Sequence, residues 1–584
     1  MNGSWNLDAI YLGYDDPAYI RDMERLQTVV DQYAQYAEDL ETKDPGEALR
    51  QCIAMEEEIF VLNNRLNTYS RLRRSTDAKD LVADSEMGKV SGIVNGCAGA
   101  KAAMRAWATT LPDLMAVVRG DESLKDYEFL FEKMLEGSRY LLPGVAEEVL
   151  ARMKQSGTSA WTSLQGYMTS TVPVSYRGET LSLSAVRNLA RNPDPQVRKD
   201  AYEAEIAAYD RIKDAVAYSL NSVKKETLTE CSLRGYKSPL ERSLKGNKLS
   251  AETLDAMMGA IEEYLPAFRK YLKAKAKLLG HEGGLPWYDL TAPVGDSSRT
   301  YTVEEAKDYL ITLFTGFDQQ LGDMMTRAFT EDWIDYYPKA GKRGGAFCAS
   351  VHALAESRVL CNFSGRFAAL LTLAHELGHA FHHQCIKTHR PLNRAYGQCL
   401  SETASTFNEC VLMDYAVKHA KTPEEKLYLL ESDLESNTMT ICDIFSRFLF
   451  ERKVFEERDK KFMSADTLGD YMLEAQRAAY GDGLDENYQH PYMWVCKGHY
   501  YGGYIFYNYP YAFGGLLSAG LYAKYLQEGP SFVPKYKKFL HTTPVATAED
   551  AAKAADIDLT DKTFWRDALQ QIADKIDQFC ELVG

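Results

Sequence analysis

The chain has 584 residues, of which 45% are hydrophobic and 26% are charged, the balance of an ordinary globular protein. Its net charge of −16 argues against a surface that binds nucleic acid or an anionic membrane. The eleven cysteines form no Cys-x-x-Cys pair, which is typical of a reducing compartment. The first residues do not resemble a signal peptide, and no apolar stretch is long enough to span a bilayer. We therefore expect a cytoplasmic protein that binds neither nucleic acid nor membrane.

The first third of the chain has the pattern of a helical protein. Residues 16–155 carry apolar side chains at helical spacing with few prolines, which predicts long amphipathic helices packed antiparallel. Asp194-Pro195 is a start signal for a long helix over residues 196–228, and further helices follow up to about residue 280. We place the domain boundary near residue 190, between an N-terminal helical domain, 1–190, and a second domain, 191–584.

A short β-rich patch interrupts the helices. Residues 285–293 predict one strand, a glycine-rich turn within 339–354 leads into another, and residues 357–363 return beside it. The edge of such a sheet could hold an extended peptide through backbone hydrogen bonds, or the strands could form a plain structural hairpin. Residues 366–584 again predict helices, with one tyrosine-rich loop at 497–515.

The segment LLTLAHELGHAFHHQ, residues 370–384, predicts a largely buried helix with a metal site. His375 and His379 are four residues apart, so their imidazoles lie on one face and can bind one Zn²⁺. Glu376 beside them can activate a water as general base. The alternative is a helix with two histidines satisfied in the core. His382 and His383 lie too far along the axis to join the site, since each turn rises about 5.4 Å, and we expect them to pack or to support the ligands.

A catalytic zinc needs a third protein ligand. Residues 398–416 predict a second helix, with Glu402 near its start and Glu409 two turns on. We choose Glu402 as the ligand and expect Glu409 to orient a ligand from outside the coordination sphere. The spacing alone does not exclude Glu409, and Asp414 is a weaker third option.

The segment 497–515, KGHYYGGYIFYNYPYAFGG, is rich in tyrosine. Its hydroxyls or His499 could donate hydrogen bonds to an oxyanion that forms during a reaction. An aromatic cluster taken by itself is more often part of a core or a hydrophobic pocket.

In combination these segments resemble the thimet oligopeptidase and oligoendopeptidase F family of zinc peptidases, and are more similar to the oligoendopeptidase F branch. The resemblance runs nearly end to end, through WNLDAIYLG at residues 5–13, the stretch from Trp161 to residue 204, and then KRGGAF, TLAHELGHAFH and SETASTFNE in that order. It implies a mainly helical, zincin-type fold with a small sheet beside the active-site helix. It also implies a deep channel with the zinc on its floor, which only short, unfolded peptides reach.

The same resemblance assigns individual residues. His375 and His379 fall on the zinc histidines, Glu376 on the catalytic glutamate and Glu402 on the third ligand. The pattern of a histidine followed at plus five and plus twelve by tyrosines, which contact substrate and transition state in the family, is matched by His499, Tyr504 and Tyr511. Asn508 stands where that pattern often has another tyrosine, and the family's cleft-lining segment is matched by residues 344–347.

The predicted function is therefore a zinc endopeptidase, with one Zn²⁺ per chain, that cleaves internal bonds of short unstructured peptides. Two imidazoles and one carboxylate suit zinc. Glu376 would take the proton of the attacking water and pass it to the leaving amine. The oxyanion would be held by zinc and by a side-chain donor, with Tyr511 the first choice and Tyr504 or His499 the next.

Three rival interpretations remain open to test. A carboxypeptidase that releases dipeptides would need a basic residue for the terminal carboxylate, and Arg343 and Arg358 are candidates. A catalytically silent peptide-binding scaffold would not need Glu376. A purely structural metal usually takes four protein ligands, often cysteines, and no cysteine is placed for that.

Overall fold

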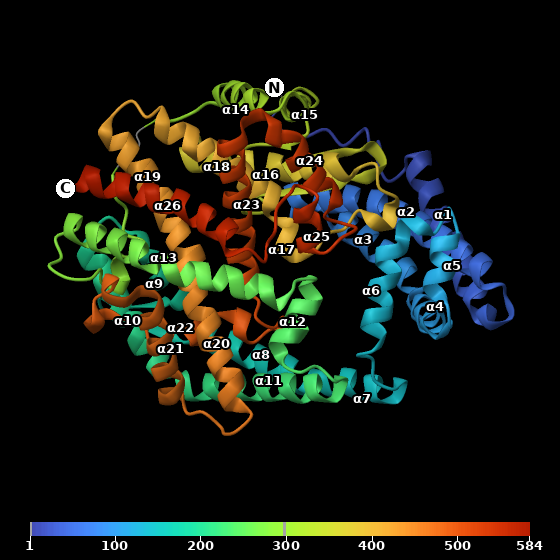
Figure 1. Ribbon diagram of the computed structural model, residues 1–584, viewed down its shortest axis with the longest axis horizontal. Helices are drawn as coiled ribbons and strands as arrows, with labels where there is room; N and C mark the ends of the chain where they lie inside the picture. The colour runs from blue at the N-terminus through green and yellow to red at the C-terminus, as the bar shows by residue number, and fades with distance from the viewer. Residues whose placement is uncertain (1–2, 296–298) are drawn as a thin grey trace. The chain divides into compact units, whose positions relative to one another are not determined.

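The structure, a computed structural model, describes residues 3–295 and 299–584 and is mainly helical, with small sheets (Figure 1). This confirms the predicted fold class. The chain forms two compact units. Unit 1 comprises residues 1–139, 299–412 and 524–556, and unit 2 comprises residues 140–298, 413–523 and 557–584. The predicted division at residue 190 concerns sequence domains rather than compact units, and it stays a prediction.

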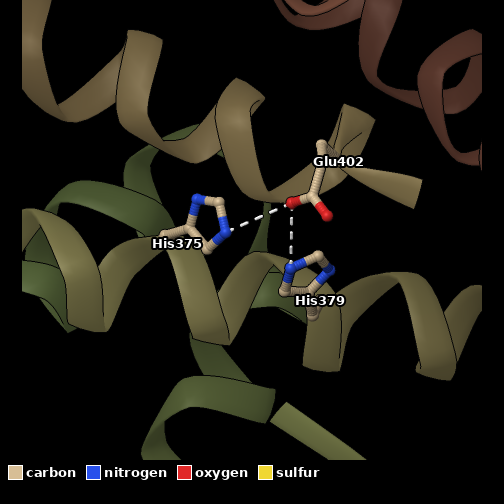
Figure 2. Close-up of side chains that lie close together, drawn as sticks. All are labelled: His375, His379 and Glu402. Atoms are coloured by element: carbon tan, nitrogen blue, oxygen red, sulfur yellow. Dashed lines mark ion pairs between the residues drawn. The ribbon is translucent and has the colours of Figure 1, made fainter. Parts of the chain in front are cut away.

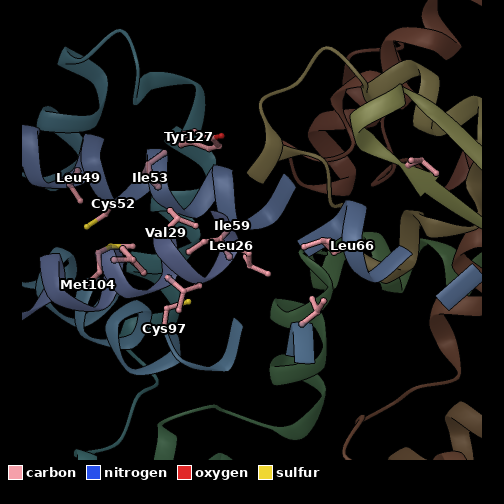
Figure 3. Packing of buried hydrophobic residues seen from close by; sticks show 14 of the residues in the cluster. Leu26, Val29, Leu49, Cys52, Ile53, Ile59, Leu66, Cys97, Met104 and Tyr127 are labelled. Carbon is pink, nitrogen blue, oxygen red and sulfur yellow. The ribbon is translucent and has the colours of Figure 1, made fainter. Parts of the chain in front are cut away.

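Unit 1 begins with the helices that the apolar spacing predicted. They are α1 (Pro17–Tyr36), α2 (Pro45–Thr76), α3 (Leu81–Asn95), α4 (Ala98–Thr110), α5 (Leu114–Gly120) and α6 (Glu128–Ser138). Asp16 and Asp44 start the first two, because each carboxylate accepts a backbone N–H and the next residue is proline. Figure 3 shows the core that these helices share, in which Leu26 and Val29 of α1 lie with Ile53 of α2.

The same core reaches a three-stranded sheet. Its strands are β3 (Ile334–Asp335), β4 (Phe347–Val351) and β5 (Glu356–Leu360), in the order β3-β5-β4. β4 pairs antiparallel with β5, with Phe347 opposite Leu360 and Val351 opposite Glu356, and β3 runs parallel to β5. The predicted strand pair is thus confirmed, and it packs against α16 (Phe367–Ile386).

The other helices of unit 1 come from its later segments. They are α14 (Val303–Phe317), α15 (Gln319–Thr330), α17 (Gln398–Ser401), the first part of α18 (Thr403–Lys418), α24 (Val533–Thr542) and α25 (Ala548–Lys553). Of these, α15 and α24 pack against α16. The helix predicted over 398–416 is therefore two helices that meet at Glu402.

Unit 2 is also helical. It contains α7 (Gly144–Ser156), α8 (Thr158–Thr171), α9 (Leu183–Asn188), α10 (Pro195–Asp210), α11 (Lys213–Arg234), α12 (Pro239–Asn247), α13 (Ala251–Leu278), α19 (Pro423–Thr438), α20 (Ile444–Arg458), α21 (Ala465–Tyr480), α22 (Met493–Cys496), most of α23 (Tyr509–Glu528) and α26 (Lys562–Val583). Asp194 caps α10 as predicted, but the predicted long helix is broken at Arg211 and Ile212. A π-helical turn, Met439–Asp443, joins α19 to α20.

Two strand assignments differ from the sequence expectation. Residues 285–293 are not a strand: Pro286 lacks an N–H, Trp287–Asp289 form a 3₁₀ turn, and Asp289 is buried in an ion pair with Arg198. The sequence reading also missed a hairpin, β1 (Pro173–Tyr176) and β2 (Glu179–Ser182), whose two turn residues Arg177 and Gly178 both have positive φ.

No helix of residues 3–295 and 299–584 combines the length and apolarity needed to cross a membrane.

Candidate active site

Helix α16 presents the predicted histidines on one face. Its opposite side is held in the core by Leu370, Leu373, Leu377 and Phe381, all buried. The rings of His375 and His379 lie one turn apart, with centroids 4.9 Å from each other and planes at 82°. Both imidazoles can therefore direct a ring nitrogen toward the same position beside the helix.

Glu402 supplies a carboxylate oxygen at that point (Figure 2). Its Oε2 lies 3.3 Å from Nε2 of His375 and 3.2 Å from Nε2 of His379. The ligand atoms of the three residues all lie within 4.8 Å of one another. Glu402 occupies the junction of α17 and α18, which turns its side chain toward α16. The set has the donor types of a catalytic zinc site.

Glu409 contacts the other nitrogen of the first histidine. Its Oε1 lies 3.0 Å from Nδ1 of His375, so the carboxylate fixes the ring and leaves Nε2 directed toward Glu402. Spacing had left Glu402 and Glu409 as alternatives. The structure places them on opposite nitrogens of the same imidazole.

Mutual attraction within the cluster sets its protonation. Burial alone lowers the pKa of His375, but the hydrogen bonds to Glu402 and Glu409 outweigh it and raise that pKa to about 10. Burial alone raises the pKa of Glu402, but the two histidines outweigh it and hold that pKa far below its usual range. The two histidines and Glu402 thus stabilise one another's charged forms.

Glu376 is the neighbouring carboxylate that is free of such partners. It is 6% exposed, and its Oε2 is buried without a hydrogen-bond partner in the described part of the chain. Burial raises the pKa of this carboxyl group. A buried carboxylate without a partner is costly, so its presence beside the candidate metal ligands points to a chemical use.

Gly378 lets α16 and α18 meet backbone to backbone. A Cβ at this position would lie 2.5 Å from the carbonyl oxygen of Ala404 and 2.6 Å from Cα of Ser405. Asn408 strengthens the crossing, because its Nδ2 donates to the carbonyl of Ala374 over 3.0 Å. This close approach is what brings Glu402 within reach of both histidines.

The remaining candidates near the motif are engaged elsewhere. His382 hydrogen-bonds with Thr543 over 2.8 Å, and Nδ1 of His383 lies 3.0 Å from Oγ of Ser357, so both pack as expected. Asp414 accepts hydrogen bonds from Lys418 and Tyr522. Arg358 is 2% exposed and its guanidinium is paired with Glu356, which argues against its capturing a peptide carboxylate. Arg343 donates its backbone N–H to Ser75 and stacks on Phe347.

The tyrosine-rich segment belongs to unit 2. It is a loop only up to Asn508, because α23 starts at Tyr509. Tyr504 and Tyr511 are exposed, and the His499 ring lies 6.1 Å from that of Tyr511, centroid to centroid. Nδ1 of His499 lies 3.2 Å from Oδ1 of Asn508. The sequence reading noted Asn508 only as a departure from a pattern and gave it no role.

Comparison with known proteins identifies related sequences. The model of peptidase family M3 matches residues 188–571, and a model described as oligopeptidase F matches residues 113–172. Oligopeptidase PepF of Bacillus subtilis is 24% identical over 99% of this chain and 87% of that protein. An oligoendopeptidase F homolog of Borreliella burgdorferi is 22% identical over 96% of this chain and 95% of that protein.

Solved structures share the fold. Oligoendopeptidase-F from Enterococcus faecium matches with a TM-score of 0.70 at 18% identity, over 97% of this chain and 99% of that one. A protein described as a peptidase from Chlamydophila abortus matches with a TM-score of 0.89 at 21% identity, over 99% of this chain and 98% of that one.

Proposed function

The chain belongs to peptidase family M3, and we propose that it is a zinc endopeptidase that hydrolyses internal bonds of short, unstructured peptides. One observation carries the proposal. Two imidazoles and a carboxylate converge within 4.8 Å beside Glu376, a buried carboxylate that lacks a partner in the described part of the chain. A peptide-binding scaffold would gain nothing from that arrangement.

The donor set fits a divalent cation, and His375, His379 and Glu402 would hold it. Two nitrogen donors and one oxygen donor favour zinc over magnesium or calcium. Zn²⁺ bound there would act as a Lewis acid toward a peptide carbonyl and would make water easier to deprotonate. Glu409 would keep the Nε2 lone pair of His375 directed at the cation through its contact with Nδ1.

Glu376 would move the proton. Its raised pKa makes the carboxylate a stronger base than an exposed glutamate. It would accept a proton as water attacks the scissile carbonyl carbon, and would deliver that proton to the leaving nitrogen as the C–N bond breaks. We assign the stabilisation of the oxyanion to a tyrosine hydroxyl, with Tyr511 first and Tyr504 second.

A peptide-library digestion tests this function. The full chain is incubated with a mixed peptide library, with and without a chelator, and the products are read by mass spectrometry. We expect internal cuts that the chelator abolishes and added zinc restores. Exclusive loss of terminal dipeptides would favour the carboxypeptidase, and the absence of any cleavage by the zinc-loaded protein would favour the silent scaffold.

A further inference from the structure

A chain of buried polar groups in unit 2 ends on His499. Asp443, the last residue of the π-helical turn, forms an ion pair with Arg447 one turn later in α20. Nη1 of Arg447 lies 3.2 Å from Oδ1 of Asn508, and the same oxygen lies 3.2 Å from Nδ1 of His499. Asn508 is 1% exposed, so bulk water does not compete for these contacts. The four side chains thus form one connected row from α20 to His499.

The chemistry of Arg447 fixes the orientation of the Asn508 amide. A guanidinium has only donors, so the group that faces it must be the amide oxygen and not the NH₂. That oxygen can only accept, and His499 meets it through Nδ1. Nδ1 must therefore carry the hydrogen, and in the neutral ring Nε2 keeps an unprotonated lone pair.

We propose that Asn508 is a positioning residue that holds His499 as the Nδ1–H tautomer, so that Nε2 accepts a hydrogen bond from a backbone N–H of the bound peptide. The tautomer follows from contacts within unit 2 alone. Only the choice of a peptide as the partner rests on the proposed function.

Two further observations support an acceptor role. Burial and the cations Arg447 and Lys497 lower the pKa of His499, despite its hydrogen bond with Asn508, and the lower pKa favours the neutral ring. The ring also lies against two tyrosines, with centroids 4.7 Å from Tyr507 and 6.1 Å from Tyr511. Neutral His499 in this tautomer has no Nε2 hydrogen to donate to an oxyanion, which leaves that task to the tyrosine hydroxyls.

The tautomer can be measured directly on the metal-free full chain. Histidine labelled with ¹⁵N on the ring shows by NMR which nitrogen carries the hydrogen, and the signals of His499 are the ones that His499→Gln removes. We expect a protonated Nδ1 and an unprotonated Nε2. A protonated Nε2, or an even mixture of the two tautomers, would overturn the proposal.

Variants of Asn508 test whether its amide selects the tautomer of His499. Asn508→Leu should release the ring into a mixture of tautomers. The matched control is Asn247→Leu, because Asn247 donates its amide to the hydroxyl of the adjacent Tyr509 over 3.0 Å and does not contact His499. The control should keep the Nδ1–H form. If Asn508→Leu kept it as well, Asn508 would not be what selects the tautomer.

Steady-state kinetics test whether Nε2 of His499 accepts a hydrogen bond from a backbone N–H of the peptide. One cleaved peptide is prepared in versions that each replace a single backbone N–H, away from the scissile bond, with an ester oxygen. For the zinc-loaded wild type we expect one position to raise KM about 3- to 10-fold, the usual worth of one hydrogen bond. His499→Phe should abolish that difference. No sensitive position, or one that persists in His499→Phe, would refute the acceptor role. Failure to cleave the parent peptide would instead refute the proposed function and leave the tautomer result standing.

Discussion

Replacing Glu409 with glutamine should weaken metal binding without removing a ligand. Oε1 of Glu409 lies 3.0 Å from Nδ1 of His375, whereas Glu402 meets the Nε2 atoms of both histidines. Glu409 would therefore act on a bound metal only through the imidazole. It fixes the ring and, by its charge, makes Nε2 a stronger donor.

The size of the effect follows from what each substitution keeps. Supporting contacts of this kind are worth about 10- to 100-fold in metal affinity, or about 1.4 to 2.8 kcal/mol. The glutamine of Glu409→Gln still offers an oxygen to Nδ1, so only the charge is lost and we expect about tenfold. Glu409→Leu loses the hydrogen bond as well and should approach about 100-fold. Glu402→Gln replaces a ligand atom and should exceed both.

The assay is competition for Zn²⁺ against a chromogenic chelator at fixed pH. Glu424→Gln is the control, because Glu424 is exposed in the first turn of α19 and its loss changes the net charge equally. Wild-type affinity in Glu409→Gln would refute the role of the supporting carboxylate. A milder loss in Glu402→Gln than in Glu409→Gln would reverse the two assignments.

Three further predictions concern the same helix. Glu376→Gln should lower turnover by at least about 10²-fold while zinc content, measured by atomic emission, stays at the wild-type level; turnover at the wild-type rate would exclude Glu376 as the base. Because the pKa of His375 is raised to about 10 without metal, zinc must displace a proton when it binds. Zinc affinity should therefore rise about tenfold per pH unit between about pH 7 and 9. A zinc affinity that does not change with pH would contradict the ion pair. Gly378→Ala should lower the free energy of unfolding by about 1–3 kcal/mol, because its Cβ would overlap the backbone of α18. The control Gly137→Ala, in open space on α6, should leave thermal stability unchanged or raise it. Equal melting temperatures in the two variants would show that the crossing of α16 and α18 tolerates a methyl group.

Local sequence patterns predicted the structure correctly where one physical rule dominated. Helices α1 to α6 follow from apolar spacing. Asp194-Pro195 starts α10 because the aspartate carboxylate accepts a backbone N–H of the first turn and the proline ring fixes a helical φ. The pair β4 and β5 followed from two short apolar runs, the first of them entered through a glycine-rich turn. In each case the decisive contacts lie within a few residues of one another.

Sequence patterns failed to predict the structure where contacts between residues far apart in the chain determine it. Residues 285–293 have strand composition, but Asp289 is held by Arg198, which is ninety-one positions earlier in the chain. The β1–β2 hairpin depends on positive φ at Arg177, a residue whose sequence preference gives little warning of it. The role of Asn508 depends on Arg447, which is equally invisible to local rules.

The candidate metal site shows both what local sequence patterns predict and where they stop. The His-x-x-x-His spacing fixes one face of a helix, but it leaves the third ligand open, because Glu402 and Glu409 are seven residues apart and a continuous helix would put them on one face. The structure separates them in two ways. The break between α17 and α18 turns Glu402 toward both Nε2 atoms, and the contact allowed by Gly378 brings α18 close enough for Glu409 to reach Nδ1. The glycine inside the motif is thus as much a condition of the site as the histidines, because a side chain there would move both carboxylates away from the ring they share.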